Sequence, residues 1–553
     1  MYSNKESVNI LTTLLVNHGV KHAVVCPGSR NAPIVHNMNE CPDIECYPVT
    51  DERSAGFYAL GMAQALHEPV AVCVTSGSAL LNVAPAVAEA KYQHVPLVII
   101  SADRPQQWID QLDGQTLPQP GALGGLVAKS VSLPVYNGTG DEETHWYCNR
   151  LVNEALLALP SCVHINVPIL EPLFEFTTPQ LPSERIIERM VPPADYSCLR
   201  PDFIESLIHA ERPMIVFGQA SVHDFSGQDV ELLFSHVIVL HESLAPFPST
   251  SHFDEVLAKA SMPAPDFVIH IGNAIVSKRL KKFLRQAKDA QVWRISPSGD
   301  VEDTFQHLRG IIVGDTELIL QAINQKLRNR KLCGLEYRRH WLTQLTKASQ
   351  HTAAFTPAYS QMTAVRCFEA RLATLGQGHA VHYANSTAIR LANIYAPHHV
   401  WCNRGVNGIE GSLSTAAGFS VAASARGTLT FCVIGDLSFF YDQNALWNQN
   451  LRSCFRILLL NNGKGGIFDM LPGLTESPAH DRLVSARHDT TAEGICHQNG
   501  IDYLSADNMD TLQTGIEWLT MPEANRCRLL EVHTDAATDC RILKEYLDSL
   551  FLP

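Results

Sequence analysis

Short apolar runs and amphipathic stretches alternate strictly through the first third of the chain. Helical patterns such as Ser54–Leu66 and Ser78–Tyr92 separate the apolar runs. This alternation is typical of a parallel sheet whose two faces are both covered by helices. The strands that it predicts are His22–Cys26, Glu45–Thr50, Val70–Thr75, Pro96–Ser101 and Cys162–Val167.

The same alternation occurs twice more, so we predict an α/β fold of three domains, each with a parallel sheet flanked by helices. We place these domains at 1–180, 195–325 and 345–553, with a proline-rich linker at Thr177–Pro193. A chain of 553 residues is long enough for about three domains. The later strands are predicted at Met214–Phe217, Val237–Leu240, Phe267–Ile271, Gln291–Ile295, Ala380–Tyr383, Thr428–Ile434, Arg456–Asn461 and Cys527–Val532.

The composition argues against several classes of protein. The net charge is −14 and no run of Lys or Arg offers a track for a phosphodiester backbone, so we expect no nucleic-acid partner. No apolar run approaches the ~18–20 residues that span a bilayer, so we expect no membrane insertion. Met1–Ile10 lacks the apolar core of a signal peptide, and the 15 scattered cysteines contain no CxxC pair. These features together predict a cytoplasmic protein with reduced thiols.

Two polar sequences in the last third follow apolar runs, where ligands bind in parallel sheets. They are Gly435-Asp436-Leu437-Ser438 and, 26 residues after Asp436, the Asn462 of Asn461-Asn462-Gly463-Lys464. This separation is about one strand–helix–strand unit, so both should lie at the same sheet edge. Mg²⁺ prefers oxygen ligands, which Asp436, Asn462 and the Lys464 carbonyl can supply. Either sequence alone could be an ordinary turn, but together they predict a magnesium–diphosphate site.

This pair of sequences resembles the signature of thiamine diphosphate (ThDP) enzymes, although Leu437 stands where that signature usually has glycine. The resemblance implies ThDP with Mg²⁺ or Mn²⁺. It assigns Glu52 to the aminopyrimidine and Ile409 to the apolar wedge beneath the cofactor. An N-terminal helical glutamate and an ordinary core isoleucine are the alternatives for these two. The implied cofactor contacts are Glu52, Ser386, Ile409, Gly435, Asp436, Leu437, Asn462 and Ile467.

Cationic residues follow many of the predicted strands, which is the edge where substrates bind. Any one of them could be an ordinary surface charge. As a set, they predict substrates that carry several carboxylates, because Arg binds a carboxylate through two parallel hydrogen bonds. The residues are Arg30, Arg104, Lys278, Arg279, Arg390 and Arg404.

Several strings that contain these cations resemble the 2-succinyl-5-enolpyruvyl-6-hydroxy-3-cyclohexene-1-carboxylate synthase family of menaquinone biosynthesis. Among them are Pro27-Gly28-Ser29-Arg30, Ala102-Asp103-Arg104-Pro105, Val276-Ser277-Lys278-Arg279-Leu280 and Asn403-Arg404-Gly405. The resemblance implies decarboxylation of 2-oxoglutarate and 1,4-addition of the resulting succinic semialdehyde carbanion to isochorismate. It also implies a homodimer or homotetramer with each active site between two subunits.

The resemblance also divides the substrate residues into groups. Ser386, Arg390 and Arg404 are assigned to 2-oxoglutarate. Ile467, Phe468 and Leu471 form an apolar wall. The residues assigned to isochorismate are Ser29, Arg30, Arg104, Gln115, Lys278 and Arg279.

Three other readings of the sequence remain open. An acetohydroxyacid synthase or a 2-oxo acid decarboxylase would share the cofactor site, but a decarboxylase with neutral products needs fewer cations. A non-catalytic nucleotide-binding scaffold would not need Glu52. A dinucleotide-dependent oxidoreductase should carry GxGxxG in its first strand–helix turn, and this sequence does not.

Overall fold

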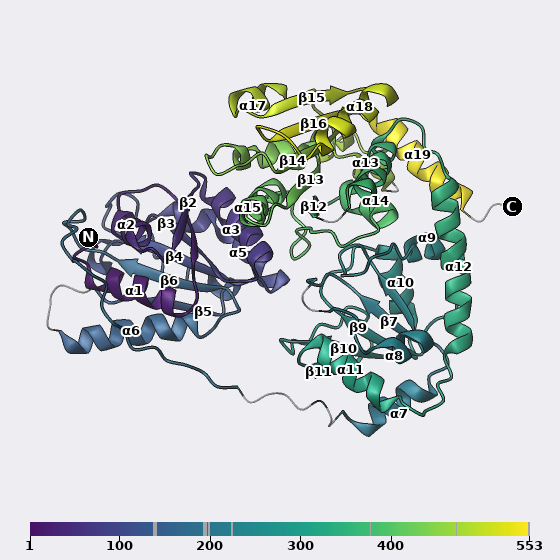
Figure 1. The fold of residues 1–553 in the computed structure, drawn as a ribbon, viewed down its shortest axis with the longest axis horizontal. Coiled ribbons are helices and arrows are strands. Elements are labelled where there is room, and N and C mark those ends of the chain that lie inside the picture. The colour runs from purple at the N-terminus through teal and green to yellow at the C-terminus, as the bar shows by residue number, and fades with distance from the viewer. Residues whose placement is uncertain are drawn as a thin grey trace.

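The computed structural model describes residues 1–553 except 136–140, 192–195, 197–198, 223–224, 377, 472 and 551–553. It contains three separate parallel sheets, each flanked by helices (Figure 1). The α/β class predicted from the sequence is confirmed. Each sheet lies inside one of the three predicted ranges, and the domain limits themselves stay predictions. Part of the predicted linker, 192–193, lies outside the described residues.

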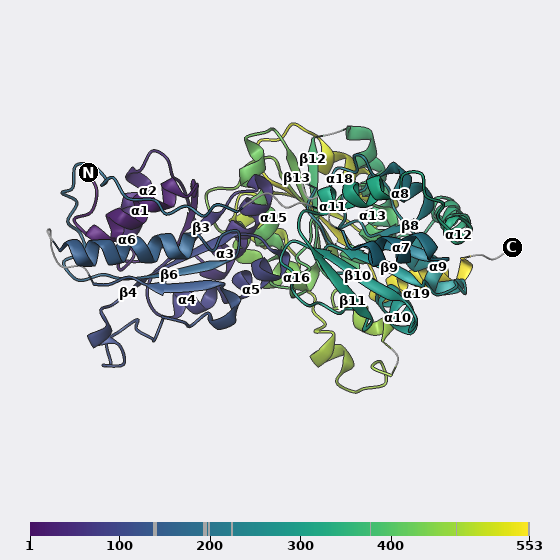
Figure 2. The same ribbon diagram turned by 90° about the horizontal axis from the view of Figure 1, so that it is seen from below.

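The first sheet has the strand order β2-β1-β3-β4-β6-β5. One apolar cluster packs α1, α2 and α6 on one face, and a second packs α3 and α5 on the other (Figure 2). The strands are β1 (His22–Val25), β2 (Glu45–Pro48), β3 (Val70–Val74), β4 (Leu97–Asp103), β5 (Lys129–Ser132) and β6 (Val163–Pro168). The helices are α1 (Glu6–Asn17), α2 (Ala32–Glu40), α3 (Glu52–Leu66), α5 (Ala84–Gln93) and α6 (Glu142–Leu156).

The middle sheet has the order β11-β10-β9-β7-β8, with α7, α8 and α11 on one face and α9, α10 and α12 on the other. Its strands are β7 (Pro213–Phe217), β8 (Ile238–His241), β9 (Phe267–Ile271), β10 (Gln291–Ser296) and β11 (Leu308–Val313). Its helices are α7 (Pro201–His209), α8 (Glu231–His236), α9 (Phe253–Lys259), α10 (Lys278–Gln286), α11 (Thr316–Lys326) and α12 (Leu335–Ala354).

The third sheet has the order β12-β13-β14-β16-β15 and carries α13, α14, α18 and α19 on one face. Its strands are β12 (His379–Tyr383), β13 (Leu429–Gly435), β14 (Phe455–Asn461), β15 (Asp502–Ala506) and β16 (Arg528–His533). Its helices are α13 (Gln361–Leu375), α14 (Thr387–Tyr395), α15 (Ser412–Ser424), α16 (Asp436–Tyr441), α18 (Met509–Thr520) and α19 (Ala536–Ser549).

Helices α3 and α15 join the first and third domains into one apolar core. Their backbones meet at two glycines. A Cβ atom at Gly61 would lie 1.9 Å from the Thr415 carbonyl oxygen, and one at Gly418 would lie 2.0 Å from the Tyr58 carbonyl oxygen. Any larger residue at either position would push the helices apart. The small residues of this region therefore fix how the first domain sits against the third.

Two further findings concern the described part of the chain. No helix there is both long enough and apolar enough to cross a membrane. All 14 cysteines in those residues are free thiols, most of them buried, which agrees with the reduced state predicted from the sequence.

Candidate active site

Asp436 joins the ends of two neighbouring strands of the third sheet. It is the first residue of α16, directly after β13, and it is buried. Its Oδ2 atom accepts hydrogen bonds from the backbone N–H groups of Asn462 (3.1 Å) and Gly463 (2.9 Å), which follow β14. Its Oδ1 atom accepts one from Leu437 N–H at 2.6 Å. The predicted pairing of Asp436 with Asn462 at one sheet edge is therefore present.

The loop after β14 can approach a ligand closely because it is rich in glycine. Gly463 has φ +74°, a left-handed conformation that favours glycine. A Cβ atom at Gly465 would lie 2.9 Å from the Phe468 ring, and one at Gly466 would lie 2.9 Å from the Asn462 amide nitrogen. Side chains at these positions would fill the cradle that the backbone forms.

The oxygen atoms at this edge suit a hard divalent cation. The Asn462 Nδ2 atom donates to Asp539 at 3.0 Å, which fixes the amide group and leaves its Oδ1 atom as an acceptor. The Lys464 carbonyl accepts from Gly466 N–H at 2.8 Å and retains a second lone pair. A carboxylate, an amide oxygen and a backbone carbonyl form the donor set that Mg²⁺ prefers beside phosphate oxygens. These residues thus fit a diphosphate-bound Mg²⁺ or Mn²⁺ ion.

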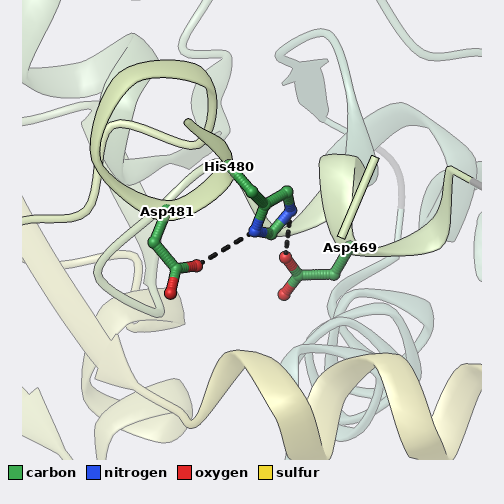
Figure 3. A group of neighbouring side chains, drawn as sticks. All are labelled: Asp469, His480 and Asp481. Carbon is green, nitrogen blue, oxygen red and sulfur yellow. Dashed lines mark hydrogen bonds and ion pairs between the residues drawn. The ribbon is translucent and has the colours of Figure 1, made fainter. Parts of the chain in front are cut away.

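A second acidic cluster lies close by, formed by Asp469, His480 and Asp481 (Figure 3). His480 contacts both carboxylates at 3.1 Å. The Lys464 ammonium group lies 2.8 Å from Asp469 and 3.3 Å from Asp481. Because this ammonium already balances the acidic charge, we interpret the cluster as an ion-pair network. It ties the Lys464 loop to the segment that contains His480.

Ser386 and Arg404 lie beside the end of β12. Ser386 precedes α14 and has φ +73°, an unusual conformation for a residue other than glycine. The preceding Asn385 accepts a hydrogen bond from the Arg404 guanidinium at 3.0 Å. The same Asn385 side chain donates to the carbonyls of Asn403 (2.6 Å) and Gly408 (2.7 Å). This asparagine, which the sequence analysis did not select, therefore shapes the loop that carries Arg404.

A cavity of about 340 Å³ lies between the middle and third domains. Of the predicted substrate residues, Lys278, Arg279, Arg390, Ile467, Phe468 and Leu471 line it. Burial lowers the pKa of Arg390, and the positive charges of Arg404 and Arg279 lower it further, while Asp254 acts in the opposite sense. Cations and apolar side chains thus share a cavity whose lining also includes the acids Glu242, Asp254 and Glu255, and the two together suit an anion with an apolar body.

Two carboxylates that the sequence analysis missed hold the basic turn at the start of α10. Asp254 pairs with Arg279 and accepts from the Ser277 hydroxyl. Buried Glu242 accepts from the backbone N–H groups of Val276 (2.6 Å) and Ser277 (2.7 Å). Burial raises the pKa of Glu242 to about 7. Asp254 lies on α9 and Glu242 directly follows β8, so only the packing of these separate elements brings the two acids to the basic turn.

The remaining cations lie on the first domain and do not line this cavity. Arg30 is buried and bonds the Ile169 carbonyl (3.1 Å) and Glu171 (3.0 Å). Arg104 pairs with Asp113 at 2.7 Å. Ser29 is exposed, as is Gln115, which has φ +55°. They follow β1 and β4, so they share the carboxyl edge of the first sheet.

Glu52 lies at the same edge of the first sheet. It is the first residue of α3, whose N-terminus is capped by Asp51, and its Oε2 atom accepts from the Asn82 amide at 3.2 Å. Ile409 lies on the third domain and keeps 41% of its surface exposed, which is unusual for an isoleucine. Ser438 donates to the Ile409 carbonyl at 2.6 Å and so ties this loop to α16. An exposed isoleucine held in this way can support an apolar ring.

The comparisons with known proteins identify the family of the chain. Residues 6–121 match the family described as "Thiamine pyrophosphate enzyme, N-terminal TPP binding domain", and residues 247–375 match "Middle domain of thiamine pyrophosphate". Three proteins named 2-succinyl-5-enolpyruvyl-6-hydroxy-3-cyclohexene-1-carboxylate synthase are similar over nearly their whole length. The protein of Bacteroides thetaiotaomicron is 44% identical over 100% of both chains. That of Phocaeicola vulgatus is 42% identical over 100% of this chain and 99% of its own, and that of Porphyromonas gingivalis is 35% identical over 99% and 97%.

Proposed function

The chain belongs to the family of 2-succinyl-5-enolpyruvyl-6-hydroxy-3-cyclohexene-1-carboxylate synthases, which are thiamine diphosphate enzymes, and on this premise we propose how its residues serve the reaction. The reaction decarboxylates 2-oxoglutarate and adds the remaining succinyl unit to isochorismate by 1,4-addition, with release of CO₂. It is a step of menaquinone biosynthesis, which we expect to take place in the cytoplasm. The cavity carries this proposal, because three cations face an apolar wall there.

The third domain holds the diphosphate end of the cofactor. Asp436, Asn462 and the Lys464 carbonyl ligate the divalent cation, and the glycines after Asn462 leave room for phosphate oxygens. When bound, the cofactor would supply a nucleophilic carbon and an electron sink for the decarboxylation. Ile409 supports the cofactor from below. Glu52 hydrogen-bonds the N1′ atom of the pyrimidine and holds a proton there.

The cationic residues bind and orient the two anionic substrates. Arg390 and Arg404, with Ser386, bind the carboxylates of 2-oxoglutarate. Lys278 and Arg279 bind isochorismate across the cavity, where Ile467, Phe468 and Leu471 cover its ring and exclude water. Charge-assisted hydrogen bonds of this kind fix the substrates at the distance and angle that the addition requires.

The first-domain residues complete the active site of a second copy of the chain. Glu52, Ser29, Arg30, Arg104 and Gln115 share one sheet edge, and of these described residues none lines the cavity of its own chain. We therefore place each active site between the first domain of one subunit and the third domain of another. A homodimer is the smallest assembly that satisfies this arrangement.

The proposal is tested by an assay of the purified protein with ThDP, Mg²⁺ and 2-oxoglutarate, with and without isochorismate. We expect release of CO₂ and a product with the mass of the succinyl adduct only when isochorismate is present. Release of CO₂ that does not depend on isochorismate would support ThDP as the cofactor but contradict isochorismate as the acceptor. Failure to bind ThDP would contradict the assignment of Asp436 and Asn462.

A further inference from the structure

Glu89 is a buried carboxylate of the first domain that bonds the backbone of the third domain. It lies on α5 and is 2% exposed. Its Oε1 atom accepts from the Gly405 N–H group at 2.6 Å, and its Oε2 atom accepts from the Val406 N–H group at 2.7 Å. Gln93, one turn along α5, donates to Oε1 at 2.5 Å. Each carboxylate oxygen therefore has a partner in a loop more than 300 residues away in sequence.

The contact between α5 and this loop is too close for most side chains. A Cβ atom at Gly405 would lie 2.7 Å from the Glu89 carbonyl oxygen and 3.0 Å from both Glu89 Oε1 and Tyr92 Cβ. Glycine at this position is therefore a requirement of the docking itself. Gly405 directly follows Arg404. The same short sequence therefore holds the arginine and the glycine that lets Glu89 reach the backbone.

The bonded segment connects two residues of the active site. Arg404 directly precedes the two amides that Glu89 accepts from, and Ile409 follows three residues after Val406. Asn385 holds the same segment from the third domain, through the carbonyls of Asn403 and Gly408. The segment is thus fixed from two sides, by an asparagine of its own domain and by a glutamate of the first domain.

We propose that Glu89 is a positioning residue for the decarboxylation half of the reaction, acting through the loop 403–409. The two charge-assisted hydrogen bonds fix the backbone on which Arg404 reaches a 2-oxoglutarate carboxylate and on which Ile409 supports the cofactor. Glu89 itself touches neither substrate nor cofactor. The inference rests on the roles proposed above for Arg404 and Ile409, and it adds that the first domain controls them within the same chain.

The test compares Glu89→Gln with the wild-type enzyme in steady-state kinetics and in titrations of ThDP. The glutamine keeps the size but places an NH₂ group against one of the two N–H donors. We expect the KM for 2-oxoglutarate and the dissociation constant of ThDP to rise about tenfold, as for the loss of one charge-assisted hydrogen bond. The KM for isochorismate should stay within about twofold, because among the described residues no hydrogen bond or ion pair joins the Lys278 and Arg279 turn to this loop. Glu89→Asp keeps both acceptors and should recover part of the loss.

Glu184→Gln is the matched control, because Glu184 is another carboxylate with a buried side chain, in the segment that follows the first domain. Its side chain is 2% exposed and bonds Asn149 and His145. It should lower the melting temperature and leave both KM values unchanged. If Glu89→Gln behaved in the same way, or raised both KM values equally, the role of Glu89 would be structural only and the inference would be wrong.

Gly405→Ala decides the question if Glu89→Gln does not fold. Its methyl group would push the loop away from an intact Glu89, so the same selective rise in the KM for 2-oxoglutarate is expected. An unchanged KM in a folded Gly405→Ala protein would overturn the inference. A wild-type protein with no isochorismate-dependent turnover would instead contradict the proposed function, so the two failures can be told apart.

Discussion

The two groups of arginines assigned to substrates differ in their partners within the chain. On the first domain, Arg30 bonds Glu171 and Arg104 bonds Asp113. In the cavity Arg279 also pairs with an acid, Asp254, whereas Arg390 there and Arg404 nearby each keep a buried Nε atom that has no hydrogen-bond partner among the described residues. The first-domain arginines are thus largely neutralised by neighbouring acids, whereas Arg390 and Arg404 retain donors that a ligand can satisfy.

The active site has two halves, the residues of the first domain and the residues around the cavity. This difference between their arginines indicates how each half is used. An unsatisfied buried donor costs about 1–3 kcal/mol, which a substrate carboxylate can recover on binding. A guanidinium that already pairs with a carboxylate must give up that pair first, so its net gain is smaller. We therefore expect the cavity half to supply most of the affinity for carboxylates. The first-domain half should contribute chiefly through Glu52.

The largest effect should follow from Glu52→Gln. Removing the carboxylate removes the group that holds a proton at the pyrimidine, so kcat should fall by roughly 10²–10⁴-fold, the range for loss of general acid–base catalysis. Glutamine can still accept from Asn82, so the melting temperature should be unchanged. Stopped-assay turnover and calorimetry check both points. A normal kcat in Glu52→Gln would show that Glu52 takes no part in the reaction.

Mixing two inactive variants tests whether the halves come from different subunits. Glu52→Gln damages the first-domain half, and Asp436→Ala damages the third-domain half. After unfolding and refolding together, a random mixture of dimers should regain about a quarter of wild-type activity, because hybrid dimers hold one intact site. Each variant refolded alone is the control. A mixture as inactive as its components would mean that both halves act within one chain.

A smaller and unequal effect should separate the two groups of arginines. Arg390→Ala should raise the KM for 2-oxoglutarate by about 10- to 100-fold, equivalent to about 1.5–3 kcal/mol for a hydrogen bond to a charged group. Arg104→Ala should raise the KM for isochorismate by less, because Arg104 must leave Asp113 to bind it. Initial rates with each substrate varied in turn measure both values. Equal effects would contradict the difference between the two groups.

Every interior strand could be predicted from the sequence, whereas only three of the six edge strands, β2, β8 and β12, could. Strands such as β3 and β14 are buried along their whole length, so their apolar runs predicted them within a residue or two. The strands not predicted were β5, β11 and β15, and each lies at the edge of its sheet. Their side chains are largely half-buried or exposed, so Lys129–Ser132 and Asp502–Ala506 lack an apolar run.

The same distinction applies to the site. Residues that follow a strand could be selected because the topology places them at the ligand edge. Three cations, Lys278, Arg279 and Arg390, share the cavity with its apolar wall, and Asp436 pairs with the loop of Asn462. Their partners could not be selected. Glu89 and Asp254 are single acids on helices with no local pattern, and Glu242, although it directly follows β8, is a single acid whose position does not indicate that it holds the basic turn. Only the packing of distant elements shows what they bond.

The smallest effect concerns the pH dependence of stability and tests the buried acid beside the cavity. Burial raises the pKa of Glu242 to about 7, above the value near 4.3 of an unfolded chain. The folded state therefore holds the proton more tightly. The contribution of Glu242 to the free energy of unfolding is present at low pH. It is lost as the pH rises from about 4.5 to 7, by an amount on the order of 1–3 kcal/mol. Melting temperatures measured from pH 5 to 8 should show this decline.

The side chain of Glu242→Gln is neutral at every pH. At pH 5 the variant should be less stable than the wild type, because it lacks an acceptor for Val276 or Ser277. As the pH rises, the variant should lose less stability than the wild type does. The charged groups that act on Glu242 are Arg404 and Asp254, and Lys281 in turn responds to Glu242. All of these remain in the variant. Asp442, whose pKa burial also raises to about 7, remains too and keeps part of the decline. If the melting temperatures of the wild type and of Glu242→Gln fell equally with pH, Glu242 would carry the same charge in the folded and unfolded states. The basic turn would then be held by a carboxylate that is ionised throughout this pH range.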